Sequence, residues 1–195
     1  MSTNQAMEKR SIEYRRGMGN WEAWGDDVEP IFRAAEKWAH ALAGVRRPWL
    51  CWNVDADWCL LQQRLVKSAG WTPVVGFDPR VGVPEHVVPE AVVVDFNADL
   101  NLPVLYPHFP LEFAFLFVER IAFWHSDLLL PEPKMREVAE LFAALPNGST
   151  AAVDTAGWRD LFSLRHRRYW ELIGCTTRAA SRDQYEKGCG WWLNF

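Results

Sequence analysis

The stretch Trp49-Leu-Cys-Trp-Asn-Val54 decides the fold class of this chain. A short and almost continuous apolar run of this length is typical of a strand that is buried on both faces. The polar triplet 55–57 follows it, then a helical pattern over residues 58–69, and then a second apolar run over residues 73–78. This order of strand, helix and strand predicts a parallel sheet that is covered by helices.

The same alternation continues along the rest of the chain. Further strands are expected at 91–95, 121–124 and 149–153. Further helices are expected at 28–43, 111–120, 134–145 and 157–173. We therefore expect an N-terminal arm over residues 1–25 and a single α/β domain over residues 26–195. This domain should have three layers, with helices on both faces of a mostly parallel, mixed sheet.

Composition narrows the possible partners and the location of the protein. The 195 residues carry 21 basic and 25 acidic side chains, a net charge of −4, without a long block of either sign. This balance argues against a nucleic acid as partner, because binding to its backbone needs clustered Lys and Arg. The apolar runs are too short to span a membrane, and residues 1–10 do not resemble a signal peptide. We expect a soluble, cytoplasmic protein, and the sequence leaves its oligomeric state open.

Several common catalytic motifs are missing from the sequence. It has no Gly-x-Gly-x-x-Gly, no phosphate-binding P-loop and no Gly-x-Ser-x-Gly elbow, and its five histidines lack the paired spacing of zinc ligands. The four cysteines also lack such spacing, so we expect them to be buried thiols. The 12 tryptophans are many for this length, and we expect most of them in the core.

Acidic residues follow several of the expected strands. They are Asp55, Asp57, Asp78, Asp95 and Asp127. In a parallel sheet such residues meet at the carboxyl edge, where carboxylates can bind a divalent cation that bridges to phosphates. The alternative is that each Asp only caps the helix that follows it.

The segment His125-Ser126-Asp127, an apolar strand end followed by a helix, resembles the D-x-D region of GT-A-type glycosyltransferases. The resemblance covers roughly residues 48–192, and it implies a Rossmann-like fold that transfers a sugar from a nucleotide-diphosphate donor to an unknown acceptor. In this sequence a histidine replaces the first acid of the motif. The implied roles are Mn²⁺ or Mg²⁺ binding by His125 and Asp127, nucleotide binding by Asn53, Asp55 and Asp78, diphosphate binding by Arg178 or Arg182, base catalysis by Glu171 or Asp183, and sugar stacking by Trp191 and Trp192.

Two other functions fit the same sequence, so enzymatic activity is left uncertain. The order of elements also resembles that of S-adenosylmethionine-dependent methyltransferases, in which Asp78 would hold the ribose hydroxyls. Against that reading, the loop 55–57 has no glycine to allow close backbone approach to a cofactor. The third reading is a non-enzymatic binding or assembly protein with Trp21 and Trp24 as interface anchors.

Overall fold

The computed structural model describes residues 29–77, 81–95, 109–152 and 173–187. Several parts of the sequence-based interpretation lie outside these ranges. They are the arm 1–25, the helix expected at 157–173 apart from its last residue, and the site candidates Asp78, Glu171, Trp191 and Trp192.

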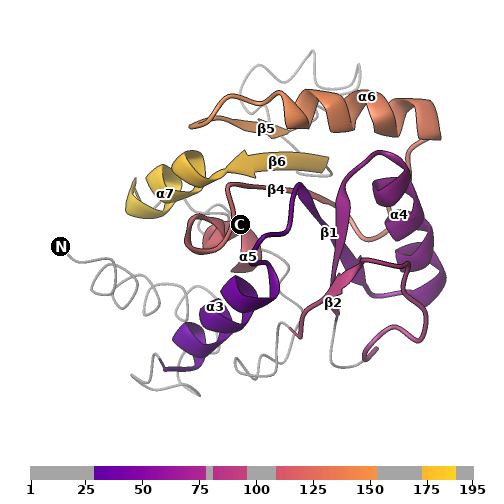
Figure 1. Cartoon of the computed structure of the whole chain (residues 1–195), viewed down its shortest axis with the longest axis horizontal. Helices are drawn as coiled ribbons and strands as arrows, with labels where there is room; N and C mark the ends of the chain where they lie inside the picture. Colours follow the sequence, from indigo (N-terminus) through magenta and orange to yellow (C-terminus); the bar gives the residue numbers. More distant parts are fainter. Residues whose placement is uncertain (1–28, 78–80, 96–108, 153–172, 188–195) are drawn as a thin grey trace, which may run out of the picture.

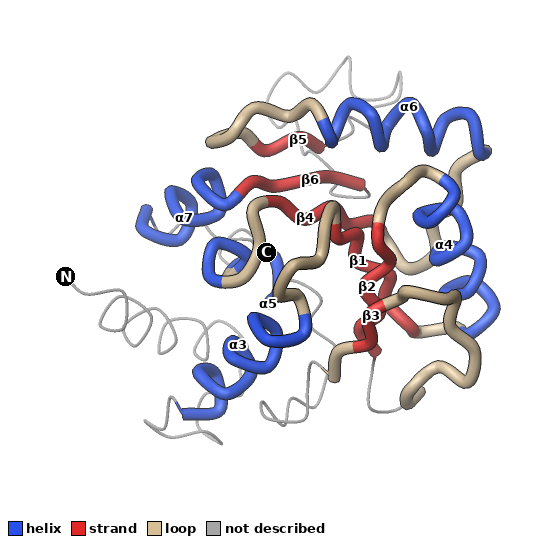
Figure 2. Tube along the Cα trace, viewed as in Figure 1, coloured by secondary structure: helices blue, strands red, loops and turns tan. Residues whose placement is uncertain are grey.

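A mixed sheet forms the centre of the protein (Figure 2). Its strands are β1 (Pro48–Asn53), β2 (Thr72–Phe77), β3 (Val92–Val93), β4 (Arg120–Trp124), β5 (Thr150–Ala152) and β6 (Ile173–Thr177), in the order β3-β2-β1-β4-β6-β5. The first four run parallel to one another, β6 is antiparallel to β4, and β5 is antiparallel to β6. The prediction of a mostly parallel, mixed sheet is therefore confirmed.

Helices cover both faces of this sheet, which confirms the three-layer architecture (Figure 1). The helical elements are α3 (Glu29–Ala41), α4 (Ala56–Ser68), α5 (Phe109–Glu112), the 3₁₀ turn η1 (Ala114–Leu116), α6 (Glu132–Ala143) and α7 (Arg178–Lys187). One core cluster contains side chains of α3, α5, η1 and α7, and the other contains side chains of α4 and α6.

The two clusters meet through the central strand β1. Trp49 and Cys51 contribute to the cluster with α4 and α6, whereas Leu50 and Trp52 contribute to the other cluster. The ring of Trp49 has centroid distances of 5.2 Å to Trp71 and 5.4 Å to both Trp124 and Phe142. Of the six tryptophans among the described residues, five are buried in the core and Trp58 is 40% exposed.

Gly76 on β2 lies directly beside the indole of Trp52 on β1. A Cβ atom built on Gly76 would be only 2.4 Å from the Trp52 ring, so no larger residue fits without movement of the indole. Glycine within a strand often marks such a close approach.

The C-terminal part of the sheet differs from the sequence-based prediction. We expected a helix to continue to residue 173, but residues 173–177 form the buried strand β6 and residues 178–187 form α7. The backbone of Gly174 lies so close to Phe123 that an added Cβ would be 2.7 Å from its ring. This close approach joins distant parts of the chain, so no local sequence pattern could reveal it.

Two smaller elements were also predicted imprecisely. The helix expected at 111–120 is reduced to α5 and η1, and the strand expected at 91–95 is reduced to two paired residues. Within the described ranges, no helix combines the length and the apolar character that a membrane crossing needs.

Candidate functional site

The strand order creates a switch point between β1 and β4. The chain passes from β1 to β2 and β3 on one side, and then returns to place β4 on the other side of β1. In open α/β sheets, ligands bind in the crevice outside the carboxyl ends of the two strands at such a point. The residues at this position are Asn53 at the end of β1 and the segment 125–127 after β4.

Asn53 is buried at the end of β1, with only 1% of its surface exposed. Its Nδ2 atom donates a hydrogen bond of 3.1 Å to the carbonyl of Gly82, which holds the β2–β3 loop against the strand end. Its Oδ1 atom has no hydrogen-bond partner among the described residues. A buried acceptor without a donor is destabilising, so such an atom at a strand end is a candidate ligand contact.

Asp55 acts as the N-cap of α4. Its Oδ1 atom accepts a hydrogen bond of 3.0 Å from the backbone N–H of Trp58, and its extended backbone is typical of this position. This contact supports the capping interpretation of the strand-end acids for Asp55. Asp57 lies exposed in the first helical turn, where a carboxylate interacts favourably with the helix dipole.

His125 and Asp127 form a pair at the end of β4. The His125 Nδ1 atom and an Asp127 carboxylate oxygen are 2.8 Å apart, and both side chains are largely exposed. The hydrogen bond with His125 lowers the pKa of the Asp127 carboxyl below its usual value. Across the described part of the chain, no group of three or more His, Cys, Asp and Glu side chains could hold a metal ion. The predicted Mn²⁺ or Mg²⁺ site therefore stays a prediction.

Helix α4 anchors both loops that border this edge. The Gln62 Nε2 atom donates hydrogen bonds of 2.8 Å to the carbonyls of His125 and Leu128. The next residue of α4 is Gln63, and its Oε1 atom accepts a hydrogen bond of 3.0 Å from the N–H of Val88 in the loop between β2 and β3. Both glutamines are fully buried.

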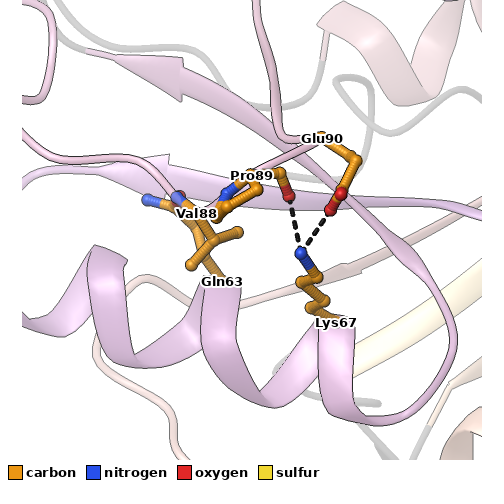
Figure 3. Close-up of polar contacts among 5 residues, drawn as sticks. All are labelled: Gln63, Lys67, Val88, Pro89 and Glu90. Atoms are coloured by element: carbon orange, nitrogen blue, oxygen red, sulfur yellow. Dashed lines mark hydrogen bonds and ion pairs between the residues drawn. The ribbon is translucent and has the colours of Figure 1, made fainter.

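One turn further along α4, a lysine continues this anchoring. The Lys67 ammonium donates a hydrogen bond of 3.0 Å to the carbonyl of Pro89 and forms an ion pair with Glu90 (Figure 3). The loop from β2 to β3 is therefore held along the helix by Gln63 and Lys67 together.

Sequence reasoning missed these anchors because it looked only at the apolar side chains of the helix. One of these, Leu61, is 44% exposed, whereas Val66 is fully buried. The buried positions are Cys59, Gln62, Gln63 and Val66. These positions follow the helical spacing i, i+3, i+4 and i+7, which was the sequence signal for the buried face. Two glutamines on that face would have indicated hydrogen bonds from this helix to other parts of the chain.

The structure places Arg178 and Asp183 at the opposite edge of the sheet. Because β6 is antiparallel to β4, its last residue Thr177 lies beside Arg120, the first residue of β4. The five residues of β4 span about 13 Å. Arg178 and Asp183 on α7 are thus separated from Asn53, His125 and Asp127 by the length of the strand. The structure does not bring these candidates together.

Local contacts give the residues of this second edge structural roles. The Arg178 Nε atom donates a hydrogen bond of 3.1 Å to the Val118 carbonyl, and its guanidinium forms an ion pair with Glu119. Asp183 forms an ion pair with Lys187 at 2.8 Å. Both contacts are compatible with stabilisation of α7 alone.

The described thiols are buried, as expected. Cys51, Cys59 and Cys175 are free cysteines, and burial raises the pKa of each, that of Cys175 to about 12. A cysteine nucleophile needs the thiolate form, which burial disfavours at these three positions. Cys189 lies outside the described residues.

Comparisons with known proteins assign this chain to no family. No family model matches the chain, and neither the curated proteins nor the solved structures contain a match.

Proposed function

We propose that the carboxyl edge of β1 and β4 binds S-adenosylmethionine and that the protein is a methyltransferase. The strand order supports this proposal most. The parallel strands lie in the order β3-β2-β1-β4, as in the doubly wound folds that bind nucleotide-type ligands at their switch point, and the order of elements along the chain also resembles that of S-adenosylmethionine-dependent methyltransferases. The switch point between β1 and β4 is where a ligand of this fold class binds.

The chemistry of Asn53 agrees with such a ligand. Its buried Oδ1 atom needs a hydrogen-bond donor. S-adenosylmethionine offers donors in its ammonium group and its ribose hydroxyls. A nucleotide sugar also offers hydroxyl donors, so Asn53 supports a ligand at this edge without separating the two candidates. Because Asp55 caps α4 in place of a glycine-rich turn, side chains rather than closely approaching backbone would hold the cofactor.

Glycosyl transfer from a nucleotide sugar is the second candidate, supported by the position of the His125–Asp127 pair directly after β4. This activity needs the diphosphate leaving group to be neutralised by a metal ion or by arginine. Both expected clamps, Arg178 and Arg182, are on α7 at the other edge. The geometry therefore supports the GT-A-type fold and activity less well than methyl transfer.

Thermal unfolding with each ligand separates the two proposals. S-adenosylmethionine at 100 times its dissociation constant should stabilise the protein by about 2.7 kcal/mol, which is a shift of roughly 5–10 °C in Tm for a chain of this size. UDP or GDP with Mn²⁺ should give no shift. A shift with a nucleoside diphosphate and Mn²⁺ that disappears in Asp127→Asn, but not in Asp183→Asn, would establish the glycosyltransferase site instead. No shift with any of these ligands would reject both enzymes.

The contribution of Asn53 is tested by calorimetry. Asn53→Leu keeps a similar volume but removes the amide, and we expect S-adenosylmethionine to bind it at least tenfold more weakly. Thr176→Val is the matched control, because Thr176 is also buried in the sheet and bonded to a neighbour, the hydroxyl of Thr150. Equal affinities of Asn53→Leu and Thr176→Val would remove Asn53 from the site.

A further inference from the structure

A concave surface lies at the amino edge of the sheet, and none of the functions considered above uses it. It has a volume of about 780 Å³, within the range of small-molecule sites. Its lining includes the turn 44–47 before β1, Gly70 before β2, and residues 117–120 leading into β4. We refer to it as the arginine hollow, because Arg46, Arg47, Arg120 and Arg178 line it.

The arginine hollow is strongly positive on a protein that is negative overall. Its four arginines face a single acidic residue, Glu119, which leaves a formal excess of three positive charges. The whole chain carries −4. A concentration of one sign within a concave surface attracts ligands of the opposite sign.

Two of the four arginines are available for a ligand. Arg120 donates hydrogen bonds to carbonyls at the end of α6, and Arg178 is paired with Glu119. The side chains of Arg46 and Arg47 are exposed and have no hydrogen bond or ion pair with the described residues. The guanidinium groups of two consecutive residues that line the hollow therefore have no partner among the described residues.

The backbone that carries these two arginines is fixed. The N–H of Thr72 donates a hydrogen bond of 3.0 Å to the Arg47 carbonyl, and its hydroxyl donates one of 2.9 Å to the Arg46 carbonyl. Arg47 has a φ of +51°, a conformation that residues other than glycine rarely adopt. Both carbonyls are engaged, so the turn is held against the first residue of β2 while its side chains point to solvent.

We infer that the arginine hollow binds a phosphomonoester with an apolar body. Guanidinium groups match the oxygens of phosphate through paired hydrogen bonds, and the excess of positive charge favours a dianion. Next to them lie apolar lining residues that suit an organic group, namely Leu42, Val45, Pro48, Phe117 and Val118. This site is separated from the proposed cofactor site by the length of β1 and β4.

Calorimetric titration with phenyl phosphate tests this inference, because this probe has a phosphate and an apolar ring but no nucleoside. We expect saturable binding to the full chain, tighter than that of inorganic phosphate. The variant Arg46→Gln/Arg47→Gln should bind phenyl phosphate at least tenfold more weakly while S-adenosylmethionine binding is unchanged. The glutamine side chains keep part of the aliphatic stem of arginine. Circular dichroism is used to check that the variant is folded.

The matched control is Lys134→Gln/Arg136→Gln, which removes the same charge from exposed positions on α6. This control should bind phenyl phosphate like the wild type. An equal loss in both double variants would show a general charge effect and overturn the inference. It is also overturned if the wild type shows no saturable binding at millimolar concentration, or if Arg46→Gln/Arg47→Gln binds normally.

Discussion

At the carboxyl edge of the sheet, an amide, an imidazole and a carboxylate lie at the ends of β1 and β4, beside loops that α4 holds in place. At the amino edge, four arginines surround a hollow, and two of them have no partner among the described residues. The two edges belong to the same strands and share the same core. The comparison teaches that strand direction decides which side chains can act together. Residues that the sequence suggests for one site lie at opposite edges of the sheet here, separated by the length of a strand.

The core beneath both edges gives the largest expected effect. Trp49→Ala removes a fully buried ring that contacts three other aromatic side chains, and we expect a loss of about 3–5 kcal/mol in the free energy of unfolding. Urea denaturation measures it. Leu141→Ala, at a position that is 62% exposed, should change the stability by less than about 0.5 kcal/mol. Similar values for the two variants would contradict this description of the core.

The amino edge is tested next by Arg120→Met. The Arg120 guanidinium donates hydrogen bonds of 2.6, 2.7 and 3.2 Å to the carbonyls of Phe142, Ala143 and Leu145, at the end of α6. Their loss should destabilise the protein by about 1.5–3 kcal/mol in urea denaturation. The control Arg136→Met changes an exposed arginine on the same helix and should have little effect. If Arg120→Met is as stable as this control, Arg120 does not cap α6.

The carboxyl edge should respond more weakly, and locally. Gln62→Leu removes two hydrogen bonds to the loop after β4, but it also removes the unpartnered buried Oε1 atom, so we expect a net loss of only about 1 kcal/mol. Amide hydrogen exchange should become faster at Leu128 and stay unchanged at Val88. Gln63→Leu should show the reverse pattern. A uniform increase in exchange in either variant would argue against separate anchoring of the two loops.

The smallest effect concerns the titration of Asp127. Because its pKa is lowered, the contact with His125 stabilises the folded state at pH values above the unfolded-state pKa, and this stabilisation is lost as the pH falls through the folded-state pKa. The carboxylate is 80% exposed, so the change in stability is small. In an NMR titration, His125→Ala should raise the pKa of Asp127 towards its usual value. The control Lys134→Gln/Arg136→Gln on α6 should leave the pKa of Asp127 unchanged. If His125→Ala also leaves this pKa unchanged, the pair does not form.

Most of the sheet was predictable from the sequence because its signals are local. The strands β1, β2 and β4 and the helices α4 and α6 begin and end within about two residues of the expected positions, since apolar runs and helical periods mark them. The strand β6 was missed, because the backbone contact of Gly174 with Phe123 joins residues far apart in the sequence. Its antiparallel direction could not be deduced from any local pattern either.

The candidate site was predictable only in part for the same reason. His125 and Asp127 were found from the rule that polar residues at strand ends face a crevice, and Asn53 from the resemblance to GT-A-type glycosyltransferases. The structure places all three at the carboxyl edge. Arg178 and Asp183 were assigned to this site on the resemblance to GT-A-type glycosyltransferases. The direction of β6 carries them to the amino edge instead.

The neighbouring positions of Gln62 and Gln63 have a mechanical consequence. Consecutive residues on an α-helix point in directions about 100° apart. Here Gln62 is hydrogen-bonded to the loop after β4 and Gln63 to the loop between β2 and β3. Turning α4 about its own axis in either direction would therefore pull one glutamine away from its loop. The pair fixes the rotation of the helix about its axis, and with it the position of Asp55 and the first turn of α4 at the carboxyl edge of the sheet.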